Sequence, residues 1–344
     1  MLITLGANPF SGYVTMFRAA FGSLEGITNT SVKSIPLLLV GVGICIAFRA
    51  NVINIGGEGQ MVVGALLATS IALALPGLPP IILIPLVLMV GAIGGAIWGG
   101  ISGALKAYFN VSEILSTIML NIVAVQIMNF LLRGPLIDPG EIARGTRIPQ
   151  TARLSHNSDL PILIEGLRMH LGFVVAILVA VIAYVLLWRT SIGFRLRSVG
   201  HSKDAARYAG ISVKKNIVGA LALSGAMAGI AGAILVFGSE SHRMVTDGSS
   251  TGFTGSAGFN GIVVALLAGL HPLWSIPSAM LFGGMLVGAN ALQRAVQVPS
   301  ALIIALNGLI VVFVVGSEYF RQRFLQVKRV DTSSDNSDDS EEEA

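Results

Sequence analysis

The stretch RTSIGFRLRSVGHSKDAARYAGISVKK occupies residues 189–215 and contains seven Lys and Arg residues against a single acid, Asp204. Apolar runs without a charged residue flank it on both sides, LGFVVAILVAVIAYVLLW (171–188) and NIVGALALSGAMAGIAGAILVFG (216–238). Both runs have about the length that a membrane-spanning helix needs, and Lys and Arg next to such helices stay on the cytoplasmic side. The stretch, called the basic island below, is therefore predicted to be a cytoplasmic loop, and it is far longer than a connecting turn requires.

The composition indicates a membrane protein. Of the 344 residues, 53% are hydrophobic and only 12% are charged, with a mean hydropathy of +0.79. Because a soluble domain carries about a quarter charged residues, we predict an all-α, polytopic bundle of membrane helices. The basic residues lie beside the apolar runs, so the net charge of +4 reflects membrane orientation and indicates no nucleic-acid partner. The single cysteine, Cys45, excludes an intramolecular disulfide.

Nine apolar runs are candidate membrane spans, at residues 34–48, 61–76, 81–105, 113–132, 171–188, 217–238, 253–270, 273–292 and 300–316. Four basic residues follow the last run, which predicts a cytoplasmic C-terminus, and nine spans then leave the N-terminus outside. An uncleaved outside N-terminus of this length is unusual. Either a further span precedes this chain, or part of residues 10–30 enters the membrane; we favour the first.

Three regions follow from this pattern. Residues 1–33 are predicted to form an N-terminal segment that lies outside the membrane or partly within it. Residues 34–317 form the transmembrane domain, with the basic island as its large cytoplasmic loop. Residues 318–344 form a cytoplasmic tail that is first basic and then acidic, and its end DTSSDNSDDSEEEA (331–344) contains too few apolar residues to fold.

A glycine-rich polar segment, RANVINIGGEGQ (49–60), separates the first two apolar runs. Each of these runs is shorter than about 20 residues, so together they predict a discontinuous membrane helix with polar groups at the break. Four residues of the break are candidates for the translocation path: Asn54, Gly57, Glu58 and Gln60. For Glu58 the structural alternatives are capping of a half-helix N-terminus and an ion pair with Arg49.

Two further sets of residues recur at a spacing of four, which places each set on one helix face. Glu113, Thr117 and Asn121 form a polar stripe that either lines the pathway or hydrogen-bonds to a neighbouring helix, and both alternatives stay open. The other set is a ridge of small residues: Gly91, Gly95, Gly99 and Gly103. Such a ridge predicts close packing against another helix.

Sequence patterns of known catalytic sites are absent. None of the six lysines follows a glycine, so the chain lacks the GxxxxGK[ST] phosphate cradle, and it contains no HExxH or paired-cysteine pattern. We therefore predict a transport subunit that is not an enzyme, that binds no metal or cofactor, and whose ATP is bound by a partner. A polar, glycine-broken path combined with a large basic loop is typical of a translocation pore with a docking platform.

Two stretches carry a family resemblance. NVINIGGEGQMVVGA (51–65) resembles the NIGxEGQ signature of the nucleoside branch of ABC importer permeases. The island is similar to the cytoplasmic GxNxxAAxxAGI segment of branched-chain amino acid, monosaccharide and nucleoside permeases, with His201 in place of the usual Asn. Glu113 and Asn121 resemble the branch's NEV…TxMLN pattern, and GFNGIVVALLAGLHP (258–272) resembles its GFxGIAVALLGxxxP. The resemblance covers about residues 9–316, and the family usually opens with one more membrane helix.

The resemblance implies that the island contains a coupling helix, SKDAARYAGI (202–211), which inserts into a cleft of an ATPase subunit. Ser202 suits its N-cap and Gly210 its end. The residues expected to make this contact are Gly200, Lys203, Ala205, Ala206, Arg207, Gly210 and Ile211. The alternative is that the island only fixes the topology. Phe259 and Asn260 join the candidate path, where Phe259 either stacks on a nucleobase or packs against apolar neighbours.

By the same resemblance, the chain is expected to be the permease subunit of an ABC importer for nucleosides in the cytoplasmic membrane. The implied partners are an ABC ATPase, a second and related permease, an extracytoplasmic substrate-binding lipoprotein and membrane lipid. The nearest alternative is the same machine carrying a monosaccharide or a branched-chain amino acid. A different class is a secondary transporter in which Glu58 and Glu113 shuttle protons, but such a carrier would not need the island.

Overall fold

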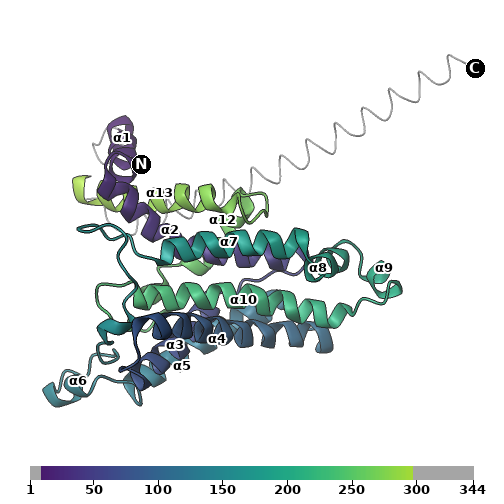
Figure 1. The fold of residues 1–344 in the computed structure, drawn as a ribbon, viewed down its shortest axis with the longest axis horizontal. Helices are drawn as coiled ribbons and strands as arrows, with labels where there is room; N and C mark the ends of the chain where they lie inside the picture. Colours follow the sequence, from purple (N-terminus) through teal and green to yellow (C-terminus); the bar gives the residue numbers. More distant parts are fainter. Residues whose placement is uncertain (1–8, 297–344) are drawn as a thin grey trace, which may run out of the picture. The chain divides into compact units, whose positions relative to one another are not determined.

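A computed structural model describes residues 9–296, and within this range the chain is built from helices without a β-strand (Figure 1). A short 3₁₀ turn, His156–Ser158, lies in the long loop before α7. The helices are α1 (Pro9–Phe21), α2 (Leu24–Arg49), α3 (Gly57–Ala74), α4 (Pro80–Phe109), α5 (Glu113–Arg133), α6 (Pro139–Arg144), α7 (Gly172–Arg189), α8 (Ser191–His201), α9 (Lys203–Tyr208), α10 (Val213–Phe237), α11 (Ser250–Thr254), α12 (Ala257–Leu267) and α13 (Ser275–Val296).

Seven of these helices are long and apolar enough to cross a membrane: α2, α3, α4, α5, α7, α10 and α13. The predicted helical membrane bundle is thereby confirmed. One predicted span needs correction, because the run 253–270 contains only the 11-residue helix α12, preceded by the short α11. The predicted span 300–316 and the predicted tail 318–344 lie outside the described residues.

The first apolar helix begins ten residues earlier than the hydropathy predicts. α2 starts at Leu24, where the Ser23 hydroxyl accepts a hydrogen bond from the Gly26 amide at 3.0 Å. The polar side chains that made this part look irregular bond back to the helix itself, as Ser31 does to the Ile27 carbonyl at 2.9 Å. Because these hydroxyls find hydrogen-bond partners within the helix, the polar residues fit into α2, which is 26 residues long. The expected short first half is therefore wrong.

The predicted glycine ridge is confirmed as a very close helix contact in the core. α4 and α10 lie side by side (Figure 1), and a Cβ added to Gly95 would lie 2.0 Å from the Gly225 carbonyl oxygen. In the same way, a Cβ on Gly229 would lie 2.1 Å from the carbonyl oxygen of Gly91. Only residues without a side chain permit this approach of two backbones, so the glycine spacing determines how α4 packs.

We expect Gly95→Ala to destabilise the bundle and Gly100→Ala to leave it intact. At Gly95 the new methyl group meets backbone, so α4 and α10 must separate, at about 1–3 kcal/mol. At Gly100 the nearest atom would be the Ala222 Cβ at 3.8 Å, which is an ordinary contact, and alanine favours the helix by up to about 1 kcal/mol. Unfolding of the two purified variants in detergent measures the difference, and equal midpoints would contradict the packing argument.

The break after α2 carries the chain back into the bundle. The chain turns at Ala50 and at Asn51, whose φ is +53°, and residues 52–55 are not helical. α3 then begins at Gly57, beside Val40, whose Cγ1 atom lies 3.2 Å from the position of a Gly57 Cβ. Since Val40 precedes the end of α2 by about 14 Å along the helix axis, α3 starts inside the bundle. The predicted glycine-rich break is therefore present, and it lies between two helices that are each long and apolar enough to span a membrane.

The basic island folds as α8 and α9 at one end of the bundle, and α1 and α6 lie at the other end (Figure 1). α8 packs tightly on the end of α2, because a Cβ on Gly200 would lie 2.1 Å from the Arg49 carbonyl oxygen. The island is therefore attached to the backbone that leads directly into the break. We call its side of the molecule the island end, and the opposite side the loop end.

Candidate functional site

Six polar side chains meet inside the bundle where α3 and α12 begin, and each is at most 7% exposed. They come from the break, α3, α5, α10 and α11. We call this cluster the polar centre; its members are Asn54, Glu58, Gln60, Asn121, Ser224 and Thr254. The structure thus brings four predicted path residues together and adds two residues that the sequence pattern did not single out.

Glu58 holds the start of α12. One carboxylate oxygen, Oε1, accepts hydrogen bonds from the Gly258 and Phe259 amides at 2.8 and 3.3 Å, and the other, Oε2, accepts one from the Thr254 hydroxyl. A carboxylate at a helix N-terminus satisfies amides that have no partner within the helix and is favoured by the helix dipole. Of the two structural alternatives, the geometry matches capping, whereas the Arg49 ion pair is absent from the described contacts.

The amides of the polar centre bind one another and the nearby backbone. Asn54 and Gln60 exchange hydrogen bonds of 3.0 and 3.1 Å between their side chains, and Asn54 also donates to the Ser224 hydroxyl at 2.7 Å. Asn121 accepts from the Gly59 amide at 2.8 Å and donates to the Ile55 carbonyl at 3.0 Å. Asn121 therefore fixes the break to α5, which matches the interhelical alternative for the polar stripe.

Glu113 lies away from the polar centre. It starts α5 at the island end, where its carboxylate forms an ion pair of 2.8 Å with Lys106 in the last turn of α4.

Three further predicted path residues lie where α3 and α12 meet. The backbone of Gly57 packs against α12, since a Cβ there would lie 3.1 Å from the Gly258 carbonyl oxygen. Phe259 is 42% exposed and Asn260 is half-buried on α12. Contact of any of these residues with a substrate stays a prediction.

The predicted coupling segment is a short exposed helix, α9. The Ser202 hydroxyl accepts a hydrogen bond from the Ala205 amide at 3.2 Å, and Gly210 follows the helix with a φ of +75°. Both predicted helix signals are therefore confirmed. Ala206 packs inward at 3% exposure, while the other predicted contact residues on the helix are exposed: Lys203, Ala205 and Arg207. Docking of an ATPase on this helix stays a prediction.

Sequence reasoning missed the group that connects the island end to the break. The Arg49 guanidinium donates to the Leu270 carbonyl at 3.2 Å and lies 5.0 Å from the centre of the Trp188 ring. The His271 ring packs against Trp188 at 4.9 Å between centroids. Burial and the neighbouring Arg49 charge lower the pKa of His271, which favours the neutral imidazole. The cluster joins α2, α7 and the turn before α13 beneath Gly200.

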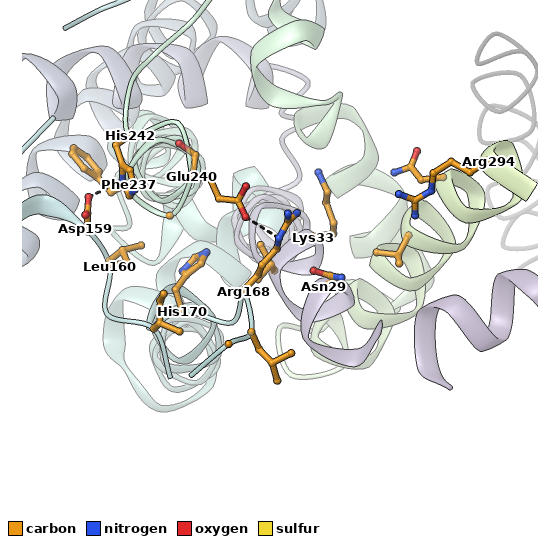
Figure 2. A pocket seen from close by; sticks show the side chains of 18 residues that line it. Asn29, Lys33, Asp159, Leu160, Arg168, His170, Phe237, Glu240, His242 and Arg294 are labelled. Carbon is orange, nitrogen blue, oxygen red and sulfur yellow. Dashed lines mark ion pairs between the residues drawn. The ribbon is translucent and has the colours of Figure 1, made fainter. Parts of the chain in front are cut away.

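A second polar feature is a cavity of about 790 Å³ at the loop end, between the long loop before α7 and the ends of α2, α10 and α13. Figure 2 shows Arg168 paired with Glu240, at 2.8 Å, and His242 beside Asp159, at 2.7 Å. Burial lowers the pKa of His170, another lining residue. The cavity gives the loop end a polar mouth, opposite the island.

Comparison with known proteins assigns the family. The family model described as the permease component of branched-chain amino acid transport systems matches residues 26–315. The chain is 36% identical to the guanosine ABC transporter permease protein NupP of Bacillus subtilis (strain 168), over 93% of this chain and 90% of the relative. It is 30% identical to the nucleoside ABC transporter permease protein NupB of Lactococcus lactis subsp. cremoris (strain MG1363), over 91% of this chain and 85% of that relative.

A third relative, the glucose ABC transporter permease protein TsgB13 of Haloferax volcanii, is 32% identical over 93% of this chain and 84% of its own length. Each of the three relatives thus matches more than 90% of this chain, but they differ in the cargo that their names give. The family model covers the whole of the described bundle from early α2 onward, including the break, the basic island and the start of α12. The chain therefore belongs to the family of branched-chain amino acid transport system permease components.

Proposed function

We propose that this chain is the membrane subunit of an ABC importer that carries nucleosides across the cytoplasmic membrane. The observation that carries the proposal is its similarity, over more than 90% of its length, to two permeases named for guanosine and for nucleosides. The NIGGEGQ break, which resembles the nucleoside branch, supports the same cargo. A monosaccharide is the second candidate, because the glucose permease of Haloferax volcanii is 32% identical.

The proposed partners occupy opposite ends of the bundle. A separate ATPase binds ATP and docks on α9, and an extracytoplasmic binding lipoprotein delivers the substrate at the loop end. A second, related permease completes the pore, and the basic residues that follow residue 316 keep the C-terminus in the cytoplasm. This chain itself requires no cofactor in the proposal. The exposure of Lys203 and Arg207 supports the docking surface, since both side chains are accessible to acidic groups on a partner.

Docking at α9 has a short physical route to the polar centre. α8 lies against the Arg49 carbonyl, Arg49 ends α2, and residues 50–56 lead from there to the hydrogen bonds of Asn54 and Glu58. Both α3 and α12 start at that point, so a displacement of the island would shift the backbone where these two helices begin. We propose that this connection couples the ATPase to the opening of the path.

Reconstitution tests the proposal. The chain is co-expressed with its ATPase, second permease and binding lipoprotein, and proteoliposomes of the complex are supplied with labelled guanosine, uridine, glucose or leucine. We expect uptake of nucleosides that requires ATP and persists with an uncoupler. Uptake of glucose or leucine alone would assign the alternative cargo. Nucleoside uptake that an uncoupler abolishes in the presence of ATP would instead indicate a proton-coupled carrier.

A further inference from the structure

A polar side chain is exposed within the membrane-spanning helix α5. Gln126 lies seven residues, or about 10 Å along the helix axis, before the end of α5 at Arg133. Its amide makes no hydrogen bond to any residue between 9 and 296. An amide that faces lipid loses the hydrogen bonds it makes in water, which is unfavourable. This face of α5 is therefore unsuited to contact with acyl chains alone.

Gln126 lines an open hollow of about 390 Å³ together with Asn129, Phe130, Arg133 and Gly134. Gln126, Phe130 and Arg133 follow one another at i, i+4 and i+7, so they share one face of the helix. Phe130 is 71% exposed, so its ring is accessible from outside the helix. The hollow therefore combines an aromatic face with polar groups on both sides of it.

Asn129 provides a fixed wall for the hollow. Its side-chain amide donates to the Gly248 carbonyl at 3.2 Å, and its oxygen accepts from the Thr246 hydroxyl at 2.9 Å. Asn129 thus holds the loop after α10 against α5, and its own polar groups are used within the chain. Gln126 and Arg133 keep theirs for a ligand, because neither has a hydrogen bond or ion pair to the described part of the chain.

The polar centre is a poor place for the same contact. Both carboxylate oxygens of Glu58 already accept hydrogen bonds. The Asn54 amide is bonded to Gln60 and Ser224, and the Asn121 amide is bonded to the backbone of the break and of α3. A substrate there would have to displace buried hydrogen bonds. In contrast, the hollow on α5 presents groups that gain partners when a ligand arrives.

We propose that Gln126, Phe130 and Arg133 form a contact site for the nucleoside on α5, where the base stacks on Phe130. This inference rests on the proposed function. A base has a flat π-face for Phe130 and a polar edge that can accept from the Arg133 guanidinium. The Gln126 amide can both donate to and accept from a ribose hydroxyl.

The test uses the whole reconstituted complex with saturating binding protein. We expect Phe130→Ala to lower the rate of nucleoside uptake about tenfold, Phe130→Tyr to keep it within about threefold, and Gln126→Leu to lower it severalfold. The matched control is Ile127→Ala, which shortens an exposed side chain next to Gln126 that does not line the hollow. A photoreactive azido-nucleoside should label α5 in the wild type and lose this labelling in Phe130→Ala.

The outcomes separate this site from the proposed function. A wild-type complex that imports no nucleoside overturns the function. Normal import by the wild type and by all the variants overturns the α5 site alone. Loss of the second permease from the purified Phe130→Ala complex would show that this face of α5 is a subunit interface, and would also overturn the site. Reduced uptake and labelling in a complex that assembles fully supports it.

Discussion

Replacing Glu58 with alanine is expected to lower the free energy of unfolding by about 3–5 kcal/mol, a large part of the about 5–15 kcal/mol that usually stabilises a folded protein. The substitution removes the acceptor of three hydrogen bonds, two of them buried: those donated by the Gly258 amide and the Thr254 hydroxyl, and the part-buried one from the Phe259 amide. Each such donor costs about 1–3 kcal/mol. Because Glu58 is fully buried, water cannot replace the carboxylate without entering the core.

Two further variants test whether the lost acceptor causes the loss of stability. Glu58→Gln keeps one acceptor for the two amides, and its NH₂ group can donate to the Thr254 hydroxyl, so we expect a loss below about 1.5 kcal/mol. Glu113→Ala removes a carboxylate whose ion pair with Lys106 is partly exposed, which costs at most about 1 kcal/mol. Denaturant unfolding of the purified variants measures all three. An alanine variant at Glu58 as stable as the one at Glu113 would refute the capping role.

Glu58→Gln also separates the two roles considered for this residue. The capping role requires acceptor oxygen, and it tolerates an amide. A role in substrate contact or proton transfer depends on the negative charge or on titration. If the Gln variant assembles and imports at the normal rate, Glu58 acts in the structure alone. If it assembles but fails to import, the carboxylate takes part in transport.

Much of the fold could be predicted because its signals are local. Glycine at every fourth position of α4 predicts close contact with another helix without identifying that helix. In the structure it is α10. Ser202 and Gly210 begin and end α9 through bonds and backbone angles of their immediate neighbours. The break at residues 50–56 follows from glycine and polar residues between two apolar runs. These features depend on residues a few positions apart.

The arrangement of the polar centre could not be predicted in this way. Thr254 and Gly258 lie about 200 residues after Glu58, and nothing near them in the sequence indicates that they donate to a carboxylate. Glu113 shares a stripe with Asn121, yet two helical turns separate an ion pair at the island end from a buried hydrogen bond. The spacing gives the face of a helix, whereas the depth along the bundle determines what each residue contacts.

Reversing the charge of Arg207 is the second large effect that we expect. Its side chain is 74% exposed and makes a single ion pair, at 3.7 Å, with Asp204 on the same helix. An exposed pair of this kind contributes about 0.5 kcal/mol or less, so Arg207→Glu should fold and insert as the wild type does. If α9 docks on acidic groups of the ATPase, two like charges then meet at the interface. Uptake and co-purification of the ATPase should each fall at least tenfold.

The matched control is Lys215→Glu, the same charge change at an exposed position of the island outside α9, for which we expect near-normal uptake. Gly200→Trp is unsuitable as a coupling test, because even a Cβ at that position would meet the Arg49 backbone at 2.1 Å and disturb the fold. An acidic-to-Lys change in the ATPase cleft that restores uptake to Arg207→Glu would locate the contact on α9. Normal uptake by Arg207→Glu together with loss in Lys215→Glu would place docking at the start of α10 instead, since only the position of the reversed charge differs between the two variants.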